Sequence, residues 1–422
     1  MPEYKRKKVR KGFNAKKKRT SKSNDIIMSN FREKEKNVLP ENDIKVVRGA
    51  KLKQKHRTKI MITAISVICV ACLFLSLVLP VSLSENVVNF FAVLGHGSYP
   101  SNISGSTVIN TVSNSSYYYI LSDTNVMAYT NGGKKIFSEL HGFSNPVISV
   151  SSTRALVFDQ GGKNLRIYNL SGEINSFETK NEIITANITR SGDFAVVTHS
   201  DSYTSTVNIY DKNCKHVYTW NSAKDIVNNV LLNSAGDKVA VSTLNAVSGQ
   251  YASKVLILDF KSADPLYSLD LDTSLVISLQ NTGKGVSVIT NDKYKFITWS
   301  KFNTTEIESS GEINICRTDK KGTLLVFNRA NDRSDNTVIL VSNKGKKISE
   351  FKINGIITDI SYNKNRVYYI SDNMAHIFDK KGSLLRSALC DYGAIKFSVI
   401  GSNSLAVITD SQIMKVNIEK GE

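Results

Sequence analysis

The amino-acid sequence predicts an all-β domain, built from repeated four-stranded units, behind one transmembrane α-helix and a basic tail. Three observations support this prediction. A charge-free apolar run occurs near the N-terminus, positive charge is concentrated on one side of it, and short β-type segments separated by polar turns recur through the rest of the 422 residues. The expected domains are a basic cytoplasmic tail (1–58), a transmembrane helix (59–83) and an extracytoplasmic β domain (84–422).

The apolar run, IMITAISVICVACLFLSLVL, covers residues 60–79 and ends at Pro80. Twenty helical residues span about 30 Å, the thickness of the hydrocarbon core of a bilayer. A buried globular helix is rarely apolar on all sides, and the long leading segment does not suit a cleaved signal peptide. The run also continues well past Cys72, which argues against a lipoprotein cysteine. We therefore expect a permanent membrane span.

The charges that flank this run predict its orientation. Five basic residues precede it directly, whereas no Lys or Arg follows it until Lys134. Basic residues flanking a span remain on the cytoplasmic side, so the N-terminus is expected in the cytoplasm and the β domain outside the plasma membrane. The same residues are expected to contact anionic lipid headgroups at the cytoplasmic face. They are Lys51, Lys53, Lys55, Arg57 and Lys59.

Most of the net charge of +18 belongs to the tail. Residues 1–59 contain 21 of the 55 Lys and Arg but 6 of the 37 Asp and Glu, which leaves this segment at +15 and the remainder at +3. The segment KRKKVRKGFNAKKKR (5–19) has too little apolar content to fold and is expected to be disordered. Since only Tyr4 and Phe13 interleave with its charges, a base-stacking platform is not supported and nucleic acid is not the expected partner.

A polar turn followed by an apolar strand recurs about every 40 residues in the β domain. Its copies are NSSYYYIL (114–121), STRALVF (152–158), SGDFAVV (191–197), AGDKVAV (235–241), TGKGVSVI (282–289), KKGTLLVF (320–327), NKNRVYYI (363–370) and GSNSLAVI (401–408). A second unit, of strand, turn and strand, follows in several copies, for example LRIYNLSGEINSF (165–177) and AHIFDKKGSLLRS (375–387). Each copy therefore has room for four strands.

Four-stranded units at this period are typical of a β-propeller, whose blades pack face to face around an axis. We expect eight blades, because the last copy ends early and the segment NVVNFFAV (86–93) can supply its missing outer strand and close the ring. Seven blades with an independent N-terminal strand is the alternative. The Tyr117–Tyr119 run is expected in a strand buried on both faces.

The repeats at residues 86–422 resemble the WD40-like and quinoprotein-like propellers, although the WD dipeptide is missing and the chain contains only Trp220 and Trp299. The layout of basic tail, anchor and propeller resembles an uncharacterised family of membrane-anchored propellers of Gram-positive bacteria. The resemblance implies the architecture and a bacterial envelope location. It implies no activity.

No motif for a catalytic centre, a cofactor or a metal occurs in the sequence. The five His that follow the apolar run form no close ligand pair, and we expect them at surface or turn positions. Cys214, Cys316 and Cys390 do not form a disulfide framework. Residues on the innermost strand of each blade face the axis, and Asn187, Arg317 and Asp359 are the candidates for contact with a polar axial ligand.

These observations favour a non-enzymatic binding or scaffold module at the bacterial cell envelope, because rigid blades present variable loops on one face. The expected partner outside the cell is an envelope protein or a wall glycan. Two alternatives are an envelope carbohydrate-active enzyme and a transmembrane sensor that signals through the basic tail. A pull-down with the tail alone separates the sensor from the binding module, and a cluster of titratable residues on one face of the ring would support the enzyme. Crosslinking in intact cells, with mass spectrometry, identifies what the outer domain captures.

Overall fold

The computed structural model describes residues 59–63, 65–67, 70, 81–103, 106–113, 116–247, 249–308, 311–318, 321–329, 332–390 and 393–419. The predicted tail, with Lys51, Lys53, Lys55 and Arg57, and most of the predicted membrane helix lie outside these residues. Residues 59–63, 65–67 and 70 are helical. Within the described ranges, no helix has both the length and the apolar character needed to cross a bilayer. The chain divides into two compact units, residues 1–79 and 80–422.

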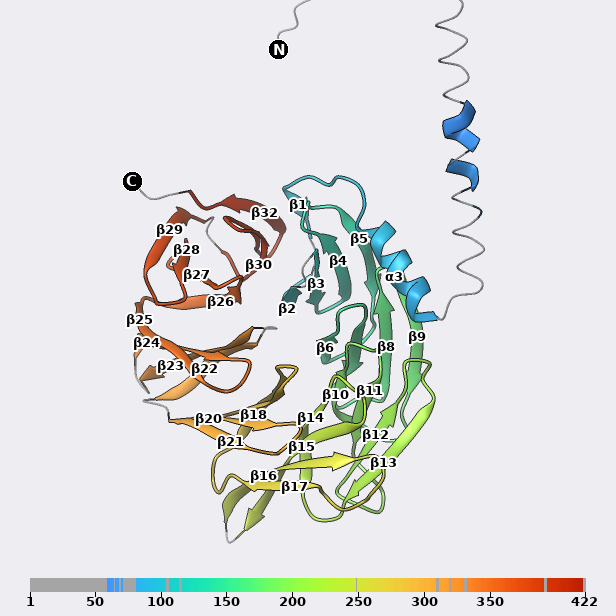
Figure 1. Ribbon diagram of the computed structural model, residues 1–422, viewed down its shortest axis with the longest axis vertical. Helices are drawn as coiled ribbons and strands as arrows, with labels where there is room; N and C mark the ends of the chain where they lie inside the picture. The colour runs from blue at the N-terminus through green and yellow to red at the C-terminus, as the bar shows by residue number, and fades with distance from the viewer. Residues whose placement is uncertain are drawn as a thin grey trace, which may run out of the picture. The chain divides into compact units, whose positions relative to one another are not determined.

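The second unit begins with helix α3 (Val81–Ala92) and continues into eight four-stranded antiparallel sheets. Figure 1 shows these sheets as the blades of a propeller, with strands β2, β6, β10, β14, β18, β22, β26 and β30 nearest its centre. Each of the first seven blades is a simple meander from its innermost to its outermost strand. The prediction of an eight-bladed, all-β propeller is confirmed.

The strands of the first four blades follow in chain order. Blade 1 comprises β2 (Val108–Ser113), β3 (Tyr117–Ser122), β4 (Asn125–Thr130) and β5 (Lys135–Leu140); blade 2 comprises β6 (Pro146–Val150), β7 (Ala155–Asp159), β8 (Asn164–Asn169) and β9 (Gly172–Glu178). Blade 3 comprises β10 (Ile183–Ile188), β11 (Phe194–Thr198), β12 (Ser205–Tyr210) and β13 (His216–Ser222); blade 4 comprises β14 (Ile226–Leu232), β15 (Lys238–Val247), β16 (Gln250–Asp259) and β17 (Tyr267–Asp270).

The other four blades continue the pattern. Blade 5 comprises β18 (Val276–Asn281), β19 (Gly285–Thr290), β20 (Lys293–Thr298) and β21 (Thr304–Glu308); blade 6 comprises β22 (Glu312–Thr318), β23 (Gly322–Arg329), β24 (Asp332–Ser342) and β25 (Lys347–Asn354). Blade 7 comprises β26 (Ile357–Asn363), β27 (Arg366–Ser371), β28 (Met374–Asp379) and β29 (Leu384–Leu389); blade 8 comprises β30 (Lys396–Gly401), β31 (Ser404–Ile408), β32 (Gln412–Asn417) and β1 (Ser101–Asn102).

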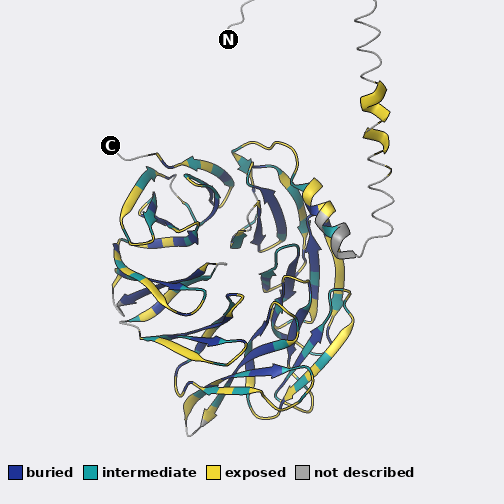
Figure 2. Ribbon diagram, viewed as in Figure 1, coloured by how far each residue is buried: buried dark blue, intermediate teal, exposed yellow. Residues whose placement is uncertain are grey.

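The recurring apolar segment of the sequence is the second strand of each blade. This strand is paired on both edges and packed on both faces, so β3, β11 and β19 are buried at every position. Figure 2 shows the contrast with the outermost strands, such as β13 and β17, in which exposed residues alternate with less exposed ones. Burial on both faces explains why the second strands are continuous apolar runs, whereas the outer strands alternate.

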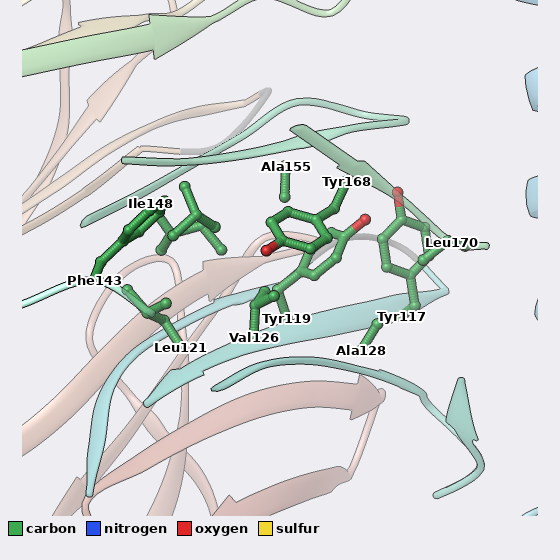
Figure 3. Packing of buried hydrophobic residues seen from close by; sticks show 11 residues of the cluster. Tyr117, Tyr119, Leu121, Val126, Ala128, Phe143, Ile148, Ala155, Tyr168 and Leu170 are labelled. Carbon is green, nitrogen blue, oxygen red and sulfur yellow. The ribbon is translucent and has the colours of Figure 1, made fainter. Parts of the chain in front are cut away.

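The core consists of eight clusters, one between each pair of neighbouring blades. Alternate residues of β3 supply two of them: Tyr117 and Tyr119 pack toward blade 2, and Tyr118 packs toward blade 8. Figure 3 shows the first cluster, where the rings of Tyr117, Tyr119 and Tyr168 lie between the two sheets. The predicted burial of the three-tyrosine run is confirmed, and each blade depends on both neighbours.

The ring closes through a different segment from the one predicted. Residues 81–92, including most of NVVNFFAV, form helix α3, and the missing outer strand of blade 8 is β1. Ser101 pairs with Ile413 and Asn102 with Gln412, and the Ile103 amide donates to the Ser411 carbonyl at 2.9 Å. The β-branched and aromatic composition of 86–93 was misleading, because contacts with the propeller at helical spacing override local β propensity.

We predict that Ile413→Ala lowers the free energy of unfolding by about 2–5 kcal/mol. Ile413 is fully buried beside Ile103, where the first and last blades meet. Chemical denaturation of the wild-type and variant chains measures the difference. Leu140→Ala is the control, because Leu140 is 69% exposed and its loss changes stability by about 0.5 kcal/mol or less. Equal effects of the two substitutions would contradict the closure.

Candidate functional site: the axial mouth of the propeller

Polar contacts join the blades around the axis, and each one involves an innermost strand or one of the two residues that follow it. Every one of the eight interfaces has at least one such contact. In order around the ring they are Tyr117 to Ser152, Asn187 to Ser149, Leu232 to Asn187, Asn229 to Val276, Gln280 to Cys316, Arg317 to Asp359, Phe397 to Asp359 and Ser113 to Ser398. These contacts hold neighbouring blades in fixed positions around the axis. They therefore also fix the positions of the solvent-exposed residues near the axis.

Asn187, one of the three predicted axial residues, lies on β10 and connects three blades. Its Nδ2 donates to Ser149 Oγ of blade 2 at 3.4 Å, and its Oδ1 accepts from the Leu232 amide of blade 4 at 3.4 Å. Asn187 is only partly buried and also lines a hollow on the axis. It therefore contributes both to the ring and to an accessible surface.

Arg317 and Asp359, the other two predicted residues, form an ion pair between blades 6 and 7. Arg317 Nη2 lies 2.8 Å from Asp359 Oδ1, and the other carboxylate oxygen accepts from the Phe397 amide of blade 8 at 3.2 Å. The side chain of Asp359 is 7% exposed and that of Arg317 is 42% exposed. Both carboxylate oxygens of Asp359 are thus hydrogen-bonded within the protein, whereas the side chain of Arg317 remains accessible to solvent.

The accessible hollow has a volume of about 490 Å³ and lies where the innermost strands of several blades end. Its apolar lining includes Ile188, Leu231 and Leu279. Its polar lining consists of amides and hydroxyls that blades 1 to 6 contribute. These residues are Ser113, Ser151, Ser152, Asn187, Thr189, Ser234, Gln280, Asn281, Thr282 and Thr318. We call this hollow the axial mouth.

Arg190 is the one charged side chain among the described residues that line the axial mouth. It is exposed and directly follows two lining residues, Ile188 and Thr189, at the end of β10. An arginine that faces water beside neutral amides and hydroxyls can bind a carboxylate, a phosphate or a polarised carbonyl oxygen. The mouth therefore offers hydrogen bonds from many directions and one fixed positive charge.

Five residues of the axial mouth, absent from the sequence-based candidates, share a position in the repeat. Each one directly precedes a copy of the recurring turn-and-strand segment, at the point where the innermost strand ends. They are Ser113, Ser151, Arg190, Ser234 and Asn281. The register of the repeat therefore marks the mouth, and this signal could have identified these residues before the structure was known.

The described titratable groups with shifted pKa values lie mostly inside the blades and not at the mouth. Burial raises the pKa of Tyr129 and of Tyr369 to about 12. Burial also lowers the pKa of His376, whose ring stacks on Tyr369 at 4.7 Å. These shifts follow from desolvation within a sheet, and they do not identify an acid and base pair poised for catalysis.

His141 occupies a turn position, as expected, but it is not at the surface. It follows β5 but is fully buried. Its Nδ1 accepts from the Phe143 amide at 3.0 Å, so the proton is on Nε2, which donates to the Ser122 carbonyl at 3.1 Å. This histidine fixes the turn between blades 1 and 2. Across the described ranges, no three His, Cys, Asp or Glu side chains group closely enough to hold a metal ion.

Solved structures similar to this chain include a WD40 domain and a propeller. The computationally designed Ika8 protein matches with a TM-score of 0.57 and 12% identity, over 75% of this chain and 98% of that one. The C-terminal WD40 domain of Sif2 matches with a TM-score of 0.54 and 11% identity, over 77% and 100%. The Dos1 propeller matches with a TM-score of 0.51 and 11% identity, over 78% and 97%. At these identities the likeness shows the fold alone.

No curated protein matches the sequence. A protein-family model does match, over residues 98–418, which include the closing strand β1 and all eight blades. The matched segment is the propeller itself and covers well over half of the chain. The protein therefore belongs to the family of unknown function described as DUF5711.

Proposed function

We propose that this protein is a single-pass membrane-anchored propeller of the cell envelope that binds a partner at the axial mouth. The observation that carries the proposal is the composition of the mouth, which is lined by amides and hydroxyls from six blades, by apolar side chains and by Arg190. Such a surface exchanges hydrogen bonds with a polar ligand and is held rigid by the ring of contacts between blades. It supports binding better than bond cleavage.

The lining also limits the chemistry of the partner. Neutral amide and hydroxyl groups suit a ligand rich in hydroxyls or amides, and the apolar lining residues suit a sugar face or an aliphatic side chain. Arg190, with Arg317 further along the ring, favours a ligand that carries a carboxylate or phosphate. A wall glycan and an extended peptide of an envelope protein both meet these requirements, and the experiment below distinguishes them.

The anchoring part of the proposal comes from the sequence. The apolar run at residues 60–79 and the five basic residues before it, Lys51 to Lys59, support a span with a cytoplasmic N-terminus and an external propeller. A rigid binding domain on such an anchor holds its partner near the membrane. The basic residues then contact anionic lipid on the inner face.

We predict that replacing Lys51, Lys53, Lys55, Arg57 and Lys59 with Gln causes a measurable fraction of chains to insert with inverted orientation. The reason is that these charges lie within a few residues of the span, where they determine topology. Terminal tags, labelled with a membrane-impermeant reagent in intact cells, report the orientation.

The matched control for this prediction replaces five basic residues far from the span. These are Lys5, Arg6, Lys7, Lys8 and Arg10. Orientation should then stay as in the wild type, with the C-terminal tag labelled outside and the N-terminal tag protected. Equal labelling of both wild-type termini, or release of the chain by carbonate, would show that the proposed anchor is wrong.

We predict that Arg190→Glu reduces capture of the partner several-fold and leaves the free energy of unfolding within about 0.5 kcal/mol, because Arg190 is exposed at the mouth. Chemical crosslinking in intact cells, followed by mass spectrometry of the full-length chain, measures capture and identifies the partner as protein or glycan. Lys380→Glu makes the same charge change on an exposed turn away from the mouth. Capture that is equal in all three chains would contradict the proposed site.

We predict a contrasting result for Asp359→Ala, which should lower the free energy of unfolding by about 2 kcal/mol. Removal of one partner of a fully buried pair costs about 3–5 kcal/mol, and the exposure of Arg317 reduces this figure. Denaturation of the full chain measures the effect. Asp201→Ala, which breaks a fully exposed pair with Lys180, should leave stability unchanged. An Asp359 variant as stable as wild type would show that the ring contact contributes little.

A further inference from the structure

Helix α3 is attached to the propeller by its polar side chains. Glu85 receives two hydrogen bonds from the Arg154 guanidinium, through Nε at 3.0 Å and through Nη2. Arg154 is only 4% exposed, and its Nη1 donates to the Lys212 carbonyl of blade 3. One turn later, Asn89 donates to the Thr153 carbonyl and accepts from the Leu170 amide. Glu85 and Asn89 thus dock the helix on blade 2.

The end of α3 is held as firmly as its middle. Ala92 packs against the cluster between blades 1 and 2, and Lys134 Nζ donates to the carbonyls of Ala92 at 3.1 Å and Leu94 at 2.7 Å. A lysine in this place satisfies carbonyls that the helix leaves open and complements its dipole. The docked residues Glu85, Asn89 and Ala92 recur at spacings of four and three, so they form one face of the helix.

The opposite face of α3 is apolar and open. Phe90 is 60% exposed, Phe91 58%, Val87 44% and Val88 41%, and Leu94 just beyond the helix is 47% exposed. A surface helix of a water-soluble domain normally turns its apolar side inward. Here the polar side is turned inward, and the arrangement leaves two phenylalanines and three aliphatic side chains in contact with solvent. Such a patch marks a surface that something covers.

Chain continuity identifies what covers this face. One residue, Pro80, separates α3 from the apolar run that ends at Leu79. A helix of 12 residues is about 18 Å long, so the whole of α3 lies within about 20 Å along the chain from the end of the proposed span. Phenylalanine and valine on one face of such a helix enter the boundary between headgroups and acyl chains.

We propose that α3 lies on the outer surface of the bilayer, with Val87, Phe90 and Phe91 inserted at the lipid interface and Glu85 and Asn89 holding blade 2 against the membrane. This inference rests on the proposed anchoring. It adds that the propeller has a fixed orientation relative to the bilayer, because the membrane-facing helix is bound to the blades through a buried arginine and does not act as a loose linker.

The test places a photo-crosslinking phenylalanine analogue at Phe91 of the full chain in native membranes. The side chain at this position is exposed, so the substitution leaves the core intact. Irradiation and mass spectrometry should show adducts with phospholipid. The matched control carries the same analogue at Tyr251, which is also 58% exposed but lies on β16 of blade 4. Lipid adducts there should be at least ten-fold fewer.

Each outcome decides the proposal. Adducts of position 91 with a protein, either a second copy or another partner, would overturn it, as would lipid adducts no more frequent than at position 251. Carbonate extraction of the same membranes separates this failure from that of the proposed function. A chain that carbonate releases was never anchored, whereas a retained chain without lipid adducts is anchored but does not rest α3 on the bilayer.

Discussion

The need of each blade to bury both faces of its sheet is the constraint on which the rest of the structure depends. The second strand of a blade, such as β19, is buried at all positions. A single four-stranded sheet of this kind would expose apolar side chains to water on both faces and would not be stable alone. Only a closed ring supplies two neighbours to every blade. The two residues of β1 complete that ring, because they cover the open edge of β32 and bring Ile103 against Ile413. Because the ring of blades is closed, the inner strands around the axis are held rigidly.

The polar side chains near the axis mainly join neighbouring blades. Asn187 and Asp359 each contact two neighbouring blades, and they are held by backbone amides as well as by side chains. Buried polar groups with satisfied partners specify one arrangement of the blades. What remains for a ligand is the set of residues at the ends of the inner strands, including Arg190, which keep their exposed surface. Asn187 joins neighbouring blades, whereas Arg190, two residues after the end of β10, keeps its side chain exposed at the mouth.

Helix α3 extends the rigid unit beyond the blades. Arg154 is buried among blade 2, blade 3 and the helix, and its charge is compensated by Glu85. Loss of that carboxylate would leave a buried cation without its partner, so the helix is strongly held. In the proposed arrangement, in which the chain is anchored in a membrane, the docked helix would give the axial mouth a defined direction relative to the bilayer.

Much of the fold could be predicted from the sequence, since the turn-and-strand repeat, including the run from Tyr117 to Tyr119, follows directly from strands buried on both faces. The closing segment could not. Ser101 and Asn102 have no strand signature, and the helix at Val87 to Phe91 has β-type composition that only the contacts of Glu85 and Asn89 outweigh. The candidates Asn187, Arg317 and Asp359 followed from their place on inner strands, whereas Arg190 was missed although it directly precedes a copy of the repeat.

The closed ring is tested most directly by native-state hydrogen exchange of the full chain at the Ile103 amide, which donates to the Ser411 carbonyl. If the two-residue strand closes the propeller, this amide exchanges only when the blades unfold, at the rate of core amides in β11 and β19. Exchange at the rate of an unprotected peptide, while those core amides stay protected, would show that the ring is open between the first and last blades.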